Sequence, residues 1–98
     1  MRLATIAAAL LLICFAVSAS AQPTPATVAN LVHEEDQAKR ETALRAVITD
    51  AKPLVRAAAA RVAAVRSATA LLPELRAALA TESDAIAARE QIRALGLL

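Results

Sequence analysis

Apolar residues recur at helical spacing through most of the chain beyond its N-terminal segment, and no stretch alternates apolar and polar residues as a strand would. The pattern predicts four or five helices with short polar links, and therefore an all-α fold. Thr27 is expected to cap a short first helix, and Asp36 is expected to cap a second helix that runs to about Thr49. Pro53 is expected at the first position of the third helix.

The same signals predict the last two helices. Ser67 is expected to cap the fourth helix, and Pro73, which falls inside its apolar pattern, is expected to kink that helix or to shift its start. A polar turn from Thr81 to Asp84 then precedes a fifth helix, which is expected to end at Gly96.

Each of these helices has one predicted inward face. The face of the third helix is wide but shallow, because alanine and valine supply little bulk, and it suits close packing on both sides. The predicted inward residues are Ala43, Leu44, Val47 and Ile48 in the second helix; Leu54, Ala58, Val62 and Val65, flanked by Val55, Ala59 and Ala63, in the third; Leu71, Leu72, Leu75, Ala78 and Leu79 in the fourth; and Ile86, Ala88, Ile92 and Leu95 in the fifth.

Residues 1–21 have the pattern of a removable export signal. Arg2 supplies a positive start, the segment from Leu3 to Val17 is almost entirely apolar, and the small residues from Ala19 to Ala21 form a cleavage site. We therefore expect export to the periplasm or the extracellular space, followed by a short extended linker at residues 22–26.

Two other interpretations of this segment stay open. A membrane span would need roughly 20 apolar residues, and the run is shorter than that. A lipoprotein signal would be modified at Cys14, but Ile13 stands where such signals take a small side chain.

Cleavage near Ala21 changes the composition of the remaining 77 residues. The cysteine, the methionine and the single aromatic residue all leave with the signal, so no disulfide framework or thiol chemistry is expected. Ten Lys and Arg face nine Asp and Glu, which leaves a net charge of +1 and no strongly basic surface. Without aromatic stacking faces as well, we expect no nucleic-acid partner.

Candidate chemistry is sparse. His33 precedes Glu34, Glu35 and Asp36, but zinc needs three or four converging ligands, and consecutive residues point in different directions. The serines and threonines of this part fall at predicted caps and turns, and Gly96 is its single glycine, which excludes a phosphate-binding glycine-rich loop. No catalytic, cofactor-binding or metal-binding residue is predicted, no cofactor is expected, and we do not expect an enzyme.

The helices repeat at a spacing of 31 to 32 residues. Leu44 to Ile48 aligns with Leu75 to Leu79 at an offset of 31, with Leu-Arg-Ala identical. At an offset of 32, three further pairs align: Asp50 with Glu82, Leu54 with Ile86, and Arg61 with Arg93.

The segment from Asp50 to Val62 carries an acidic residue, a proline, Val-Arg and an alanine-rich helix, and it resembles the turn and second helix of short bacterial HEAT repeats. Ala70 to Leu79 is similar to the first helix of a following repeat, and Gln91 to Gly96 to the close of one. The resemblance covers about Glu41 to Leu98 and implies a short α-solenoid of about two helix pairs in a module at residues 27–98.

The family resemblance also implies a contact between repeats. The aspartate and arginine that match Asp50 and Arg56 typically bridge neighbouring repeats in this family. In the second copy Glu82 keeps the acid, but Ala88 stands where the arginine would be, so a continuous arginine ladder is not expected.

These observations lead to one functional hypothesis and one alternative. We expect an exported, non-catalytic helical-repeat scaffold or protein-binding module. Because about two repeats are few for a stable solenoid, we expect a piece of a longer array or self-association. The alternative is a loosely folded amphipathic periplasmic protein that becomes ordered on a membrane surface or a partner.

Overall fold

The computed structural model describes residues 22–98, so the predicted export signal at residues 1–21 lies outside the described part. Residues 22–98 contain helices and no strand, which confirms the all-α prediction. No helix in this part is long and apolar enough to span a bilayer. The α-helices are α2 (Pro25–Ala29), α3 (Gln37–Val47), α4 (Pro53–Val65), α5 (Leu72–Ala80) and α6 (Ala85–Leu97), and the 3-10 helices are η1 (Asn30–His33) and η2 (Thr69–Leu71).

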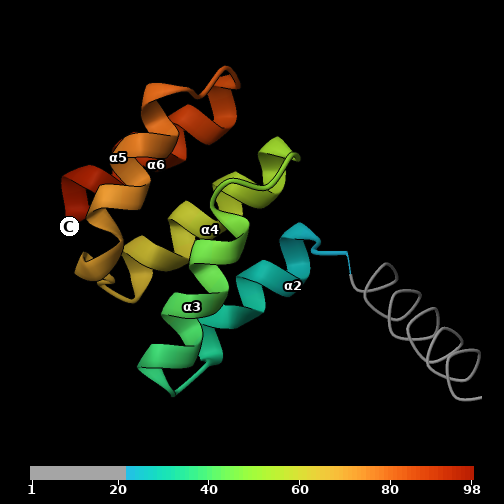
Figure 1. Cartoon of the computed structure of the whole chain (residues 1–98), viewed down its shortest axis with the longest axis vertical. Helices are drawn as coiled ribbons and strands as arrows, with labels where there is room; N and C mark the ends of the chain where they lie inside the picture. Colours follow the sequence, from blue (N-terminus) through green and yellow to red (C-terminus); the bar gives the residue numbers. More distant parts are fainter. Residues whose placement is uncertain (1–21) are drawn as a thin grey trace, which may run out of the picture.

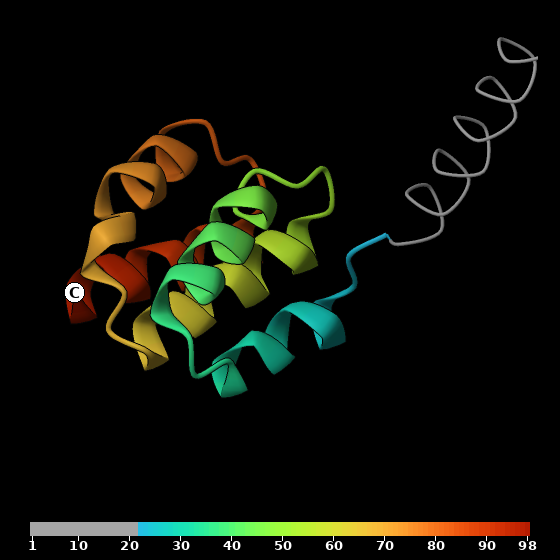
Figure 2. The same cartoon turned by 60° about the horizontal axis from the view of Figure 1, so that its bottom comes forward.

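The helices form two layers (Figures 1 and 2). α4 packs between α2 and α6, so these three helices lie side by side in one layer. α3 and α5 form the other layer, α3 against α4 and α5 against α6. The chain therefore crosses from one layer to the other at each long turn, and helices two apart in the sequence become neighbours.

The core is centred on α4, which has seven of its 13 residues buried. Five of these seven are alanines, and the other two are Val55 and Val62. Larger side chains fill the space between the layers; the largest fully buried apolar ones are Leu44, Ile48, Leu71, Leu75 and Val55. Small residues on α4 allow close packing with its neighbours, while leucines close the gap to the second layer.

Three helices begin at side-chain caps. Asp36 accepts a hydrogen bond from the Lys39 backbone N–H at 3.1 Å, which confirms its predicted capping of α3. Asp84 caps α6 in the same way. The prediction that Thr27 caps the first helix is wrong. Thr24 is the cap, since Pro25 places Thr24 in an extended conformation, so α2 begins inside the predicted linker.

Pro53 is the first residue of α4, as predicted, but Ser67 does not cap the next helix, because η2 and α5 begin after Ala68 and Leu71. Ser67 instead ends α4 in a left-handed conformation with φ of +50°. The Ala68 N–H bonds to the Ala63 carbonyl at 2.9 Å, and the Ser67 N–H bonds to the Ala64 carbonyl at 3.2 Å. This pattern is a Schellman motif, which more often has glycine at the left-handed position.

The remaining helix ends differ from the predictions by a few residues. Pro73 lies in the first turn of α5, so it shifts the start of that helix, which is one of the two predicted outcomes. α3 ends at Val47 instead of Thr49, and α6 continues past Gly96 to Leu97. The exact residue at which a helix ends depends on local hydrogen bonds, which the spacing of apolar residues does not encode.

The inward face predicted for α6 is wrong in part: Leu95 packs against the core as predicted, but Ile86 and Ile92 are exposed. Ile92 is 59% exposed, whereas Glu90 is 2% exposed on the opposite side of the helix. The buried residues of α6 are Ala87, Glu90, Gln91 and Ala94. Small side chains face α4 because the two helices pack closely. Of the two buried polar side chains, Gln91 donates a hydrogen bond to Glu82 and Glu90 lies near Arg61 of α4. A search for large apolar residues therefore selects the outer face.

The α4 prediction fails in the same direction at two positions. Leu54 and Val65 were expected inside but are 56% and 64% exposed, respectively. The flanking residues Val55, Ala59 and Ala63 are fully buried instead. The buried face of α4 is thus rotated from the predicted one, toward the side of the helix that carries smaller side chains.

Replacing Ser67 with glycine should stabilise the protein by about 0.5–1 kcal/mol, because glycine adopts the left-handed conformation without the steric cost of a Cβ. Thermal unfolding followed by circular dichroism measures the change. Ser83→Gly is the matched control, since Ser83 is an exposed turn serine without a positive φ. Equal effects of the two substitutions would contradict the role assigned to the Ser67 backbone.

Candidate functional site

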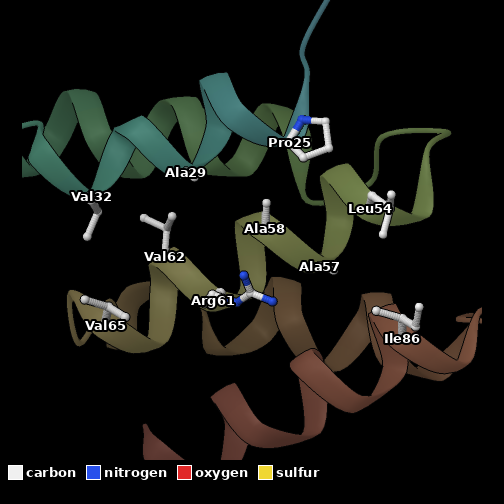
Figure 3. Close-up of a pocket in the computed structure, with 10 residues that line it drawn as sticks. All are labelled: Pro25, Ala29, Val32, Leu54, Ala57, Ala58, Arg61, Val62, Val65 and Ile86. Atoms are coloured by element: carbon white, nitrogen blue, oxygen red, sulfur yellow. The ribbon is translucent and has the colours of Figure 1, made fainter.

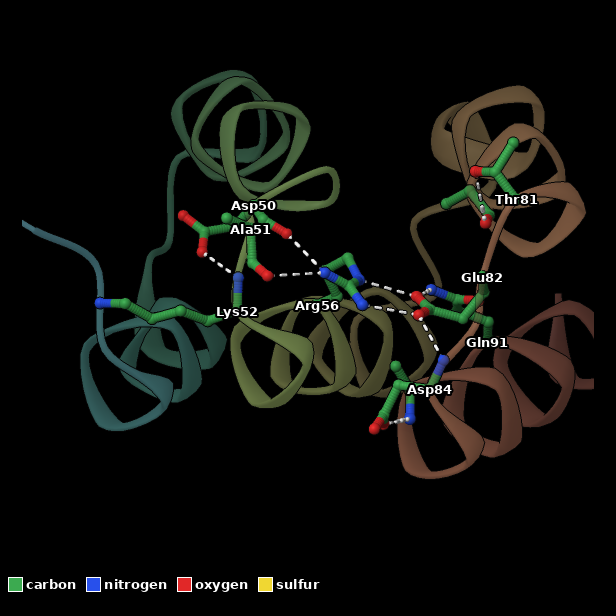
Figure 4. Close-up of polar contacts among 10 residues, drawn as sticks. Asp50, Ala51, Lys52, Arg56, Thr81, Glu82, Asp84 and Gln91 are labelled. Carbon is green, nitrogen blue, oxygen red and sulfur yellow. Dashed lines mark hydrogen bonds and ion pairs between the residues drawn. The ribbon is translucent and has the colours of Figure 1, made fainter.

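A buried ion pair joins the turn before α4 to the turn before α6 (Figure 4). Arg56 of α4 donates to the Glu82 carboxylate from Nε at 2.7 Å and from Nη2 at 2.6 Å, which is a bidentate pair. Its Nη1 donates to the Asp50 and Ala51 carbonyls at 2.8 and 3.1 Å. One guanidinium therefore fixes the turn before α4 and ties it to the turn before α6.

The Glu82 carboxylate has further donors around it. The Gln91 side-chain amide donates to Oε1 at 2.7 Å, and the Asp84 backbone N–H donates to Oε2 at 3.1 Å. The side chain of Glu82 is only 1% exposed. Its hydrogen bonds, that from Arg56 first, outweigh the effect of burial and lower the pKa of Glu82 to about 2.

The charged groups of this network are engaged within the chain. A polar hollow of about 240 Å³ opens beside it, lined in part by Thr49, Thr81 and Ser83. However, both Glu82 oxygens are engaged by donors from within the chain, and Arg56 directs its three nitrogens at chain acceptors. The pair thus has little capacity left for a bound molecule.

Arg56→Ala should destabilise the protein by about 2–4 kcal/mol, because it leaves the Glu82 carboxylate buried without its main partner. Urea unfolding followed by circular dichroism measures the loss. Arg76→Ala, at an exposed arginine of α5, should change stability by less than about 0.5 kcal/mol. If Arg56→Ala does not fold, Arg56→Lys, which keeps the charge but not the bidentate geometry, should show a smaller loss. Wild-type stability in both Arg56 variants would contradict the assignment.

The Glu82 pKa also predicts an acid-sensitive step. Because the folded-state pKa is lowered to about 2, the stability from this carboxylate is complete above its unfolded pKa of about 4.3 and is lost as the pH falls toward 2. NMR titration of the Glu82 side chain should show the low pKa directly. Glu82→Gln should show a smaller loss of stability between pH 4.5 and pH 2.5 than the wild type, with exposed Glu35→Gln as control. An ordinary Glu82 pKa would refute this.

An apolar groove lies across the layer of α2, α4 and α6 (Figure 3). Its volume is about 400 Å³. Figure 3 shows Leu54 and Val65 at opposite ends and Arg61 between them. The lining residues are Pro25, Ala29, Val32, Leu54, Ala57, Ala58, Arg61, Val62, Val65 and Ile86. Nine of these ten are apolar, so the groove suits an apolar partner surface.

A charge cluster borders the groove. Arg61 Nη2 lies 3.6 Å and Arg89 Nη2 lies 3.7 Å from Glu90 Oε1. The two arginine side chains are 63% and 65% exposed, whereas Glu90 is buried. Both separations exceed hydrogen-bond length, and Glu90 Oε2 has no hydrogen-bond partner. Two exposed guanidiniums thus share one buried carboxylate, and the cluster keeps an excess positive charge.

The residues considered as candidate sites in the sequence lie at helix caps, turns and helix ends. His33 ends η1 and is exposed, the Glu34 side chain accepts the Asp36 N–H at 3.3 Å, and Asp36 caps α3. Ser67 forms the end of α4. Among residues 22–98, no group of three or more His, Cys, Asp and Glu side chains is placed to hold a metal ion.

Sequence reasoning missed the groove and the cluster beside it. The groove needs Leu54 and Ile86 outside, and both were assigned to the core. Their alignment at an offset of 32 marked them as equivalent, but equivalence does not decide between inside and outside. Glu90 gave no signal, because a glutamate in an alanine-rich helix is ordinarily solvated. No protein-family model, curated protein or solved structure matches the chain.

Proposed function

We propose that this chain is an exported, non-catalytic helical-repeat module that binds a protein through the groove of α2, α4 and α6. The apolar groove is the observation that carries the proposal, because its rim leaves large aliphatic side chains exposed. Leu54, Val65 and Ile86 are all exposed, although the chain has buried positions filled by alanine close by. Exposed apolar surface of this kind marks interaction sites in many proteins.

The environments of aligned residues favour a HEAT-like repeat. Leu44 and Leu75, which align at an offset of 31, are both fully buried. Leu54 and Ile86, which align at an offset of 32, are both exposed and both line the groove. The pairs α3–α4 and α5–α6 also cross between the same two layers. We therefore propose a short solenoid of two helix pairs, with α2 as a further helix of the same layer as α4.

A similar arginine contact is present at two of the turns. Arg40 donates to the Glu34 carbonyl at 2.7 Å, and Arg56 donates to the Asp50 carbonyl at 2.8 Å, each from six residues further along the chain. The turn before α6 has Ala88 at that spacing from Glu82 and lacks such a contact. The turns before α3 and α4 thus share one arginine contact, which the turn before α6 does not repeat.

The chemistry of the ion-pair network and of the groove also favours a scaffold. The network of Arg56 and Glu82 is satisfied within the chain, and the groove offers apolar contact with one basic border. Neither arrangement supplies a nucleophile with an adjacent base. We place the protein outside the cytoplasm on the pattern of residues 1–21.

Co-purification from the producing cells tests the binding function. A partner retained by the wild type should fall at least tenfold with Leu54→Asp and with Val65→Asp, because a carboxylate at the rim opposes apolar docking. Both positions are exposed, so the fold should persist, which circular dichroism checks. Ala77→Asp, at an exposed position of α5 in the other layer, should retain the partner.

Equal recovery of every partner by all of these variants would contradict binding through the groove. A protein that gains most of its helicity only when anionic vesicles are added would support the alternative, an amphipathic protein that orders on a membrane.

A further inference from the structure

We infer that the groove accepts an acidic amphipathic helix, whose apolar side chains enter the groove and whose carboxylate pairs with Arg61 and Arg89. The inference rests on the proposed function and names the chemistry of the partner. It depends on three features of the site: the length of the groove, its exposed rim and the uneven charge of its border.

The length of the groove matches a helix of a few turns. Leu54 and Val65 mark its two ends on α4, and Val65 lies eleven positions after Leu54, which is a rise of about 16 Å along the helix. A docked helix uses side chains at positions i, i+4 and i+7, which span about 10 Å. The groove therefore has room for three such anchors and one flanking polar residue.

The exposed rim favours a helix over a small ligand. Sites for small molecules bury most of the ligand surface, roughly 70–90%. Here Leu54 and Val65 at the two ends of the groove, and Ile86 on its rim, stay exposed, so the groove is open to solvent. A helix covers such an open groove and buries the rim side chains at the same time.

The charge of the border selects an acidic helix. Arg61 is the one charged residue among those lining the groove, and its guanidinium makes no hydrogen bond to the carboxylate of Glu90, 3.6 Å away. Arg89 approaches the same carboxylate from α6. Glu90 is buried beneath them, so the outward donors of both arginines are free to meet a carboxylate from outside.

A displayed peptide library tests this inference on protein recovered from cells that express the whole chain. The library holds 16-residue helical peptides with leucine at i, i+4 and i+7 and random residues elsewhere. Binders should be enriched in Asp or Glu beside the leucine stripe. Changing that acid to its amide in a selected peptide should weaken binding at least tenfold, and this comparison leaves the protein unaltered.

Protein variants locate the acid. The double variant Arg61→Gln with Arg89→Gln should bind the acidic peptide and its amide equally, whereas Arg76→Gln should keep the wild-type preference. A library without binders, or binders without enriched acid, overturns the inference. Binders without enriched acid that Leu54→Asp still abolishes would overturn the acidic partner but leave docking in the groove intact. Vesicles of phosphatidylglycerol should not bind; vesicle binding without peptide binding also overturns the inference.

Discussion

The bidentate contact between Arg56 and Glu82 is the constraint on which the arrangement of the helices depends. Apolar packing between α4 and α6 involves mainly small side chains, which fix the relative position of two helices weakly. The arginine adds direction, because its planar group must meet the carboxylate and the turn carbonyls of Asp50 and Ala51 at once. A rotation of α6 about its axis would break several of these bonds together.

Close packing of α4 and α6 has a cost that the side-chain amide of Gln91 offsets in part. Alanine contributes little apolar area, so this interface gains less from the hydrophobic effect than one built of leucine. Gln91 is fully buried there, yet its amide donates to Glu82 and so extends the network of Arg56 into the interface. Specific hydrogen bonds thus add to the stability of a small apolar core, because a short chain buries a smaller fraction of its surface.

The fold class and most helix starts could be predicted from the sequence because they depend on local chemistry. Asp36 and Pro53 act within one turn of their own positions, and a pattern of neighbours is enough to assign them. Ser67 was assigned wrongly in this way, since serine is common before a helix and uncommon at a left-handed helix end. The buried faces of α4 and α6 were harder still to predict, because each depends on the small side chains of the facing helix.

The error on α6 has the same physical origin as the groove. Ala87 and Ala94 face inward because α4 offers alanines and leaves no room for larger side chains. The bulky residues of α6 must then lie elsewhere on the helix, and Ile86 lies on the side that borders the groove. Leu54 of α4 is displaced outward for the same reason. The exposed apolar groove is therefore a direct consequence of packing this layer through its smallest residues.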